Sequence, residues 1–189
     1  KLRKSLRKVR YEIIFVDDNS PDGTSEEVQV FMKRSQNIRL IRRIGRRGLS
    51  GAVIEGIFAS NASLVGVMDC DLQHDESKLL EMFSLFKKKT SLDVVVGSRF
   101  TEEGKISYGA FSKIREVGSK AMTIIIKKLL NINSTDPLSG FFMVKKDSFL
   151  AQSKKLQNQG FKILADFLAI SGNKIEVAEI GYEFKNRVM

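Results

Sequence analysis

The chain has 189 residues, of which 42% are hydrophobic and 29% charged, and its formal net charge at pH 7 is +10. The length suits one domain with a buried core, and the composition excludes a disordered chain. The single cysteine, Cys70, excludes an intrachain disulfide, and no apolar stretch reaches the roughly 18 residues of a membrane span. We expect a cytoplasmic domain whose partners are phosphorylated substrates or an anionic membrane surface, and not nucleic acid, for which the sequence has no motif.

The first third of the sequence alternates between helical and extended patterns. Lys1–Val9 has apolar residues at helical spacing and predicts the end of a helix. Tyr11–Val16 predicts a strand, which stops at the turn-forming residues 17–23. Thr24 and Glu27 have the spacing of a capping box, which predicts that the next helix begins there.

The same alternation continues, with strands at Ile38–Ile41, Leu64–Met68 and Asp93–Val96 and helices at Ser50–Ala59 and Ser77–Lys88. It indicates βαβ units and a mostly parallel sheet, hence an α/β fold that occupies residues 1–189 as a single domain. Beyond Arg99 we expect a long helix at Phe111–Leu130, a loop at Asn131–Gly140, a short strand at Phe141–Val144, helical segments through Ser171 and a final strand at Ile175–Phe184.

Charged side chains follow three of the predicted strands. Asp17 and Asp18 follow the first, Asp69 and Asp71 follow a later one, and Arg99 follows the next. Ligands of open parallel sheets bind beyond the carboxyl ends of the strands. We therefore expect these side chains to converge at one edge of the sheet.

The segment after Leu64–Met68 has the residue types of a metal site. Asp69, Asp71 and Gln73 alternate, so their side chains can face one point. Their oxygen atoms suit a hard divalent cation, Mg²⁺ or Mn²⁺, which would neutralise a diphosphate leaving group. An Asp-x-Asp segment by itself is more often a solvated loop, and the second acidic cluster at Asp17 favours the metal site.

Two residues of the same segment receive no catalytic role. Cys70 lies between the aspartates and is expected to face the protein interior as a small apolar side chain. His74 is the only histidine and has no evident catalytic partner, so we expect an ordinary loop residue.

Six segments, in this order along the chain, resemble glycosyltransferase family 2 and within it the dolichol-phosphate mannose synthases: Val16–Thr24, Gly48–Ala52, Asp69–His74, Gly97–Arg99, Asp136–Phe141 and Gly160–Leu164. The resemblance implies the GT-A fold, which is Rossmann-like. It also implies an inverting, metal-dependent transfer of mannose or glucose from a nucleotide sugar such as GDP-mannose or UDP-glucose to dolichyl or undecaprenyl phosphate.

The resemblance also assigns roles to individual residues. Asp17 and Asp18 would contact the nucleoside of the donor, and Asp69, Asp71 and Gln73 would hold the metal. Arg99, Arg115 and Arg187 would bind phosphate groups of the donor or the acceptor. The residues expected to be catalytic are Asp71 and Asp136, the latter on the acceptor side. Asp136 could equally be the aspartate that starts the turn before Pro137.

Several alternatives stay open at this point. The acceptor could be a soluble glycan, with Asp136 or a neighbour as the base, or the chain could be a non-catalytic nucleotide-binding fragment. The basic amphipathic pattern of Phe111–Leu130 fits either a membrane interface or the protein core. The absence of tryptophan speaks against the processive polysaccharide synthases of this family.

The family's first strand has no counterpart in this sequence. We therefore expect a sheet that lacks this strand, a chain truncated at the amino terminus and also at the carboxyl terminus, and an open edge on Tyr11–Val16. One wall of the nucleobase pocket would then be absent, so the chain should bind nucleotide sugar weakly.

Overall fold

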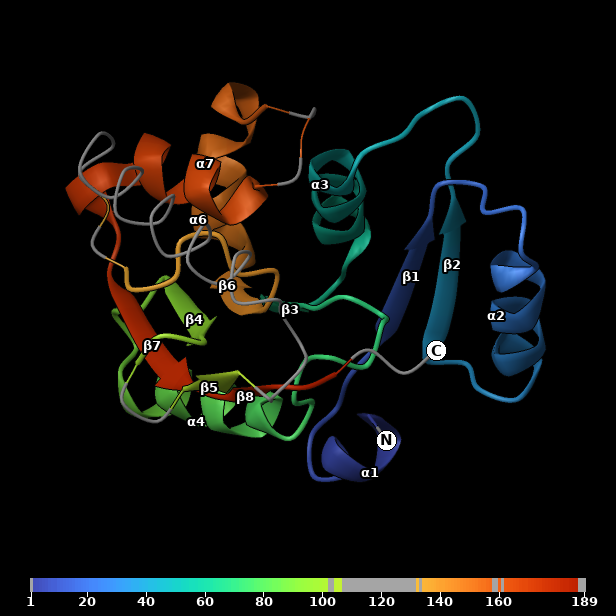
Figure 1. The fold of residues 1–189 in the computed structure, drawn as a ribbon, viewed down its shortest axis with the longest axis horizontal. Coiled ribbons are helices and arrows are strands. Elements are labelled where there is room, and N and C mark those ends of the chain that lie inside the picture. Colours follow the sequence, from blue (N-terminus) through green and yellow to red (C-terminus); the bar gives the residue numbers. More distant parts are fainter. Residues whose placement is uncertain are drawn as a thin grey trace.

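The computed structural model describes residues 2–101, 104–106, 132, 134–157, 160 and 162–186. They form sheets flanked by helices, which confirms the predicted α/β class (Figure 1). The predicted helix Phe111–Leu130 and the candidate residues Arg115 and Arg187 lie outside the described residues.

The amino-terminal part of the chain forms a two-stranded parallel sheet with a helix on each face. Its elements are α1 (Leu2–Ser5), β1 (Ile13–Asp17), α2 (Thr24–Lys33), β2 (Ile38–Arg42) and α3 (Leu49–Ala59). β1 pairs with β2 from Ile13 opposite Ile38 to Asp17 opposite Arg42. Figure 1 shows α2 on one side of this sheet and α3 on the other. The sheet therefore presents Asp17 at the carboxyl end of β1, as the sequence predicts.

The start of α2 differs from the prediction. The residue before the helix is Gly23, and no side chain caps the helix. Thr24 instead donates hydrogen bonds from its backbone N–H and its hydroxyl to Oδ1 of Asp22, at 3.0 and 2.7 Å. The predicted capping box of Thr24 and Glu27 is therefore wrong, because the nearer carboxylate of Asp22 takes the Thr24 donors.

The second sheet has the strand order β3-β6-β4-β7. Its strands are β3 (Leu64–Val67), β4 (Val94–Ser98), β6 (Phe142–Lys145) and β7 (Val177–Gly181). β6 runs antiparallel to both of its neighbours, whereas β4 and β7 are parallel. Three of the five pairings among the described strands are parallel, so the sheets are mostly parallel with one reversed strand.

The predicted final strand Ile175–Phe184 is two strands in the structure. β7 ends at Gly181, and β8 (Glu183–Phe184) pairs in parallel with β5 (Lys105–Ile106). Tyr182 lies between them, and its ring is buried. The chain therefore changes its pairing partner at Tyr182, and β8 forms a separate two-stranded sheet with β5.

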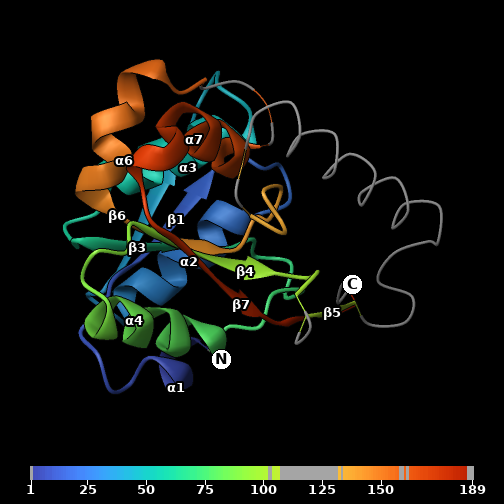
Figure 2. The same ribbon diagram turned by 90° about the vertical axis from the view of Figure 1, so that its left-hand side faces the viewer.

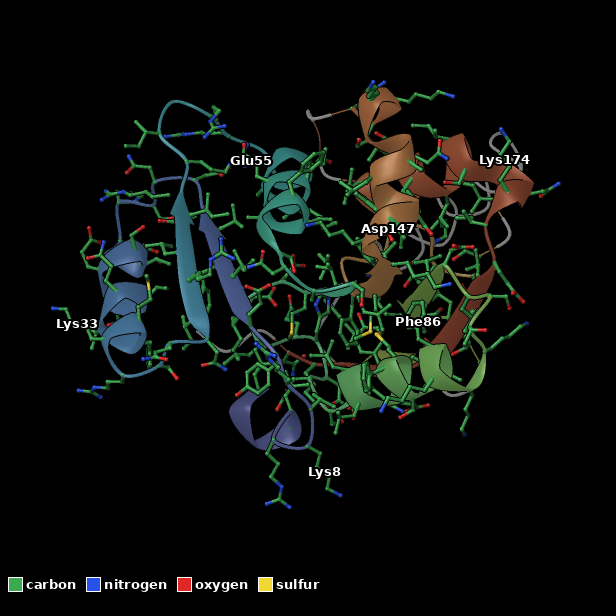
Figure 3. The ribbon with its side chains drawn as sticks, turned by 180° about the vertical axis from the view of Figure 1, so that it is seen from behind. Lys8, Lys33, Glu55, Phe86, Asp147 and Lys174 are labelled. Carbon is green, nitrogen blue, oxygen red and sulfur yellow. The ribbon has the colours of Figure 1, made fainter. Side chains whose placement is uncertain are left out.

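Helices cover both faces of the second sheet (Figure 2). α4 (Lys78–Lys88) lies on one face; on the other lie α6 (Lys146–Gln152), η1 (Ser153–Lys155), α7 (Ile163–Ser171) and η2 (Gly172–Lys174). In β4, Val94 and Val96 pack with α7, whereas Val95 packs with α4, whose Phe86 is labelled in Figure 3. Because successive side chains of β4 point to opposite faces, this strand contributes to the cores on both sides of the sheet. Burying each of these valine side chains stabilises the fold by about 1.5–3 kcal/mol.

Among the described residues, β1 and β3 each have an open edge. β1 pairs only with β2, and β3 pairs only with β6. The expected absence of the family's first strand stays a prediction. Separately, none of the helices in the described parts of the chain is long and apolar enough to cross a membrane.

Candidate active site

The residues that follow β3 form an acidic loop, residues 69–74. The Asp69 side chain is 41% exposed, and Oδ1 of Asp71 accepts a hydrogen bond from the Gln73 backbone N–H at 3.1 Å. Partial burial and the neighbouring Asp71 carboxylate raise the pKa of Asp69, and the positive charge of Arg99 opposes this rise. The charges of Asp71 and Arg99 therefore act on the Asp69 carboxylate in opposite directions.

Gln73 is held in one orientation by Lys185, the residue that follows β8. Its Nε2 donates to the Lys185 carbonyl oxygen at 2.9 Å, and the Lys185 N–H donates to the Gln73 carbonyl oxygen at 2.9 Å. Because the amide nitrogen is used in this way, Oε1 is the side-chain atom left to bind a cation.

The acidic loop has the donor set of a magnesium or manganese site. Two carboxylates that repel each other and one amide oxygen are ligands that a hard divalent cation prefers. The described residues hold no group of three or more His, Cys, Asp and Glu that would surround a metal by themselves. Phosphate oxygens and water would therefore complete the coordination, as is usual for a cation that binds a diphosphate.

Arg99, at the end of β4, forms a buried ion pair with Asp136. Its backbone N–H, Nε and Nη2 donate to the Asp136 carboxylate at 3.2, 2.7 and 2.8 Å. The Arg99 side chain is 10% exposed and that of Asp136 is 0% exposed. Since both Asp136 oxygens accept hydrogen bonds from Arg99, the geometry favours a carboxylate that orients an arginine, and it lends no support to Asp136 as a base toward an acceptor.

The turn that carries Asp136 is itself fixed to the second sheet. Glu179 of β7 accepts hydrogen bonds from the Ser134 hydroxyl and from the backbone N–H and hydroxyl of Thr135, at 2.6 to 2.7 Å. The Ser139 hydroxyl donates to the Gly97 carbonyl oxygen at 2.7 Å. These hydrogen bonds fix the turn, and with it the position of the Asp136 carboxylate that binds Arg99.

Asp17, at the end of β1, is buried and bound within its own turn. Its carboxylate accepts the Ser20 hydroxyl at 2.5 Å, the Ser20 N–H at 3.2 Å and the Ser25 hydroxyl at 2.5 Å. Burial acts to raise the pKa of Asp17, but these hydrogen bonds outweigh it, so the pKa lies below the usual value. Asp17 therefore shapes the loop before α2, and its expected contact with the nucleoside stays a prediction.

Asp18 fixes the loop between β2 and α3. Its two oxygens accept hydrogen bonds from Arg43 Nη1 and from the Gly48 N–H, both at 2.7 Å. Gly48 has φ +124°, a conformation that favours glycine, which explains the glycine at this position. Arg43 and Arg46 also donate to Glu55 of α3, which Figure 3 labels. The Asp18 side chain is still 28% exposed, so a nucleoside contact remains open to it as a prediction.

One expectation about the acidic loop is wrong, and the burial of a second residue was not expected. Cys70 is exposed and does not face the interior. His74 is 3% exposed and packs among aromatic side chains. Sequence reasoning missed His74 because its partners are distant in sequence, and the only local signal is its place five residues after Asp69.

Gly140 allows Asp69 to approach the turn that follows Asp136. A Cβ at Gly140 would lie 2.9 Å from Oδ2 of Asp69. We expect Gly140→Ala to displace the Asp69 carboxylate, which is the mobile end of a side chain, at little cost in stability. Turnover should fall, and the Mn²⁺ concentration needed for half-maximal turnover should rise, while the melting temperature stays near that of the wild type. Mn²⁺ titration of turnover, paired with thermal denaturation, checks this; an unchanged Mn²⁺ requirement would contradict it.

The sequence of the chain shows its family. The chain belongs to glycosyl transferase family 2, whose sequence model matches residues 2–151. This confirms the predicted resemblance and the glycosyltransferase class.

The chain is similar to proteins described as dolichol-phosphate mannosyltransferases. It is 33% identical to that of Pyrococcus furiosus over 188 residues, which cover 97% of this chain and 51% of the relative. It is 35% identical to that of Saccharomyces cerevisiae over 159 residues, which cover 84% of this chain and 57% of the relative. The chain thus spans little more than half the length of these curated relatives.

A solved structure shares the fold at low sequence identity. Glucosyl-3-phosphoglycerate synthase from Mycobacterium tuberculosis, in complex with Mn²⁺, UDP-glucose and phosphoglyceric acid, aligns with a TM-score of 0.70 at 14% identity, over 100% of this chain and 66% of that one. At this identity the likeness shows the fold alone, and it confirms the predicted GT-A fold.

Proposed function

We propose that this chain is the catalytic part of an inverting, metal-dependent hexosyltransferase that moves mannose from a nucleotide sugar to a polyprenyl phosphate. The observation that carries the proposal is that Asp69 shares a loop with Asp71 and packs against Gly140, in the turn whose Asp136 binds Arg99. A carboxylate pair suits a divalent cation, and an adjacent arginine suits a phosphate group. The names of the relatives support mannose and dolichyl phosphate among the possible substrates.

In the proposed reaction, Asp69, Asp71 and Oε1 of Gln73 would hold a Mg²⁺ or Mn²⁺ ion. When bound, this ion supplies positive charge that neutralises the departing diphosphate. The bound Mn²⁺ and UDP-glucose of the mycobacterial synthase support a divalent cation and a nucleotide sugar as partners of this fold. GDP-mannose is the donor we favour, and UDP-glucose is the second candidate.

Arg99 is held by Asp136 and would position a phosphate group of the donor or the acceptor. The bond between the sugar C1 and the diphosphate oxygen breaks as an acceptor phosphate oxygen bonds to C1 from the opposite face, which inverts the anomeric configuration. A phosphate monoester is already largely anionic at pH 7, because its second pKa is about 6, so the reaction needs no strong base. This fits the position of Asp136, whose oxygens are both bound to Arg99. Phosphate contacts by Arg115 and Arg187 remain predictions from the family resemblance.

The proposal includes the cytoplasmic face of a membrane as the place of reaction. The net charge of +10 favours an anionic surface, and a polyprenyl acceptor resides in a bilayer.

A transfer assay tests the proposed function. The purified chain, and a version extended by an upstream strand that could pair with the open edges of β1 and β3, are incubated with Mn²⁺ and radiolabelled GDP-mannose or UDP-glucose. Acceptors are vesicles with or without dolichyl phosphate, and a soluble mannose oligosaccharide. We expect EDTA-sensitive transfer of label from GDP-mannose to lipid only with dolichyl phosphate present, and more of it with the extended version.

Other outcomes of the assay have distinct meanings. Label in the oligosaccharide would contradict the lipid acceptor, and transfer that survives EDTA would contradict the metal. No transfer by either folded version would contradict the proposal as a whole. Flotation of the same vesicles tests the membrane surface, because protein that stays in the dense fraction at low salt would contradict membrane binding.

A further inference from the structure

His74 is the last residue of the acidic loop, and its side chain lies within a cluster of aromatic rings. Its ring stacks on Phe141, with centroids 5.2 Å apart and planes 16° apart, and it meets the edge of Tyr182 at 5.7 Å. Phe184 of β8 lies 5.8 Å away. Three rings from two other segments thus fix the plane of the imidazole, and with it the directions of its two nitrogens.

Both ring nitrogens are directed at the same residue, Asp69. Nδ1 of His74 accepts a hydrogen bond from the Asp69 backbone N–H at 3.2 Å. Nδ1 must therefore be unprotonated, and the neutral ring carries its proton on Nε2. Nε2 lies 4.0 Å from Oδ2 of Asp69, which is an electrostatic contact beyond hydrogen-bond length.

The environment of His74 agrees with a neutral ring. The ring is only 3% exposed, and Nδ1 is already occupied by the Asp69 N–H. A neutral imidazole can hold the Asp69 backbone without adding a positive charge that would compete with a bound cation.

We propose that His74 is a positioning residue for Asp69, which it holds in place against the repulsion of Asp71. This inference rests on the proposed function, in which Asp69 is a metal ligand. His74 acts on the backbone N–H and the carboxylate of Asp69, and the proposal gives it no contact with substrate or cation. Groups that orient a metal ligand in this way are typically worth about 10 to 100-fold in metal affinity.

Substitutions at His74 distinguish a role in orienting Asp69 from a role in packing the aromatic cluster. His74→Phe keeps an aromatic ring in the cluster but removes both nitrogens. His74→Asn keeps an oxygen near the position of Nδ1 that can accept the Asp69 N–H. Cys70→Ser is the matched control, because Cys70 lies in the same loop and its side chain is exposed.

Binding of Mn²⁺ to each variant, without donor or acceptor, is measured from the electron paramagnetic resonance signal of free Mn²⁺, together with the melting temperature. We expect about tenfold weaker binding by His74→Phe, an intermediate loss for His74→Asn and no loss for Cys70→Ser. Wild-type Mn²⁺ affinity in a folded His74→Phe would overturn the proposal. If His74→Phe does not fold, wild-type affinity in His74→Ala would do the same.

A second measurement does not depend on the metal. Because the chain has one histidine, nitrogen NMR of a protein without a histidine tag reports the tautomer of His74 alone. We expect the proton on Nε2 at neutral pH, and a proton on Nδ1 would overturn the contact with Asp69. A wild-type protein that binds no Mn²⁺ would instead contradict the proposed metal dependence, and the tautomer would still decide the contact.

Discussion

Asp71→Asn is expected to lower turnover by at least about a hundredfold, with a comparable loss for Asp69→Asn, because each change removes a charge that stabilises the departing diphosphate. The fold should be unaffected. Asparagine keeps the oxygen that accepts the Gln73 N–H, and the change removes a repulsion that raises the pKa of Asp69. The melting temperature should therefore stay the same or rise slightly. Initial rates at saturating Mn²⁺, with thermal denaturation of each variant, check both parts.

Cys70→Ser is again the control, since it changes the residue between the two aspartates without changing charge. It should keep wild-type rates. Either Asp→Asn variant with wild-type turnover in the presence of Mn²⁺ would show that the acidic loop does not bind the catalytic metal.

Arg99→Ala is expected to destabilise the protein by about 3–5 kcal/mol, because it leaves the Asp136 carboxylate buried without its charged partner. For a domain of this size the melting temperature should fall by about 6–20 °C, at about 2–4 °C per kcal/mol. Turnover should also fall, through the lost phosphate contact. Arg99→Lys keeps the charge but cannot form the two-pronged contact with Asp136, and should lie between the wild type and Arg99→Ala.

The control for stability is Arg46→Ala. Arg46 also pairs with a carboxylate, that of Glu55, but its side chain is 58% exposed, so the loss should be within about 1 kcal/mol. A double-mutant cycle of Arg99→Ala and Asp136→Ala completes the test, using chemical denaturation. If the stability losses of the two single variants add up to the loss of the double variant, the two residues are not coupled. Residues in contact share an interaction energy, so the losses should not add.

The positions of the elements were largely predictable from sequence. Leu64–Met68 was predicted as a strand and is observed at Leu64–Val67, and Ser77–Lys88 was predicted as a helix and is observed at Lys78–Lys88. Such patterns depend on the spacing of apolar residues, which recur every 2 residues in a strand and about every 3.6 residues in a helix. They also depend on the turn residues that end each element. The acidic loop was found for the same reason, since it lies directly after a strand.

Long-range pairing was not predictable in the same way. Nothing in the local pattern of Phe142–Lys145 indicates that β6 enters the sheet between β3 and β4 in the reverse direction. The pairing partner of a strand depends on residues far along the chain, and so does the change of partner at Tyr182 that separates β7 from β8.

The sequence by itself determined the family, the α/β class and the acidic residues Asp69 and Asp71, because these depend on residue type and local order. Only the tertiary structure showed that Asp136 binds Arg99, 37 residues away, and that His74 is buried against Phe141 and Tyr182. The physical reason is that burial and charge pairing depend on which segments the sheets bring together. An aspartate before Pro137 has the same local sequence whether its carboxylate faces solvent or an arginine, and the packing of β4 and β7 around its turn decides between the two.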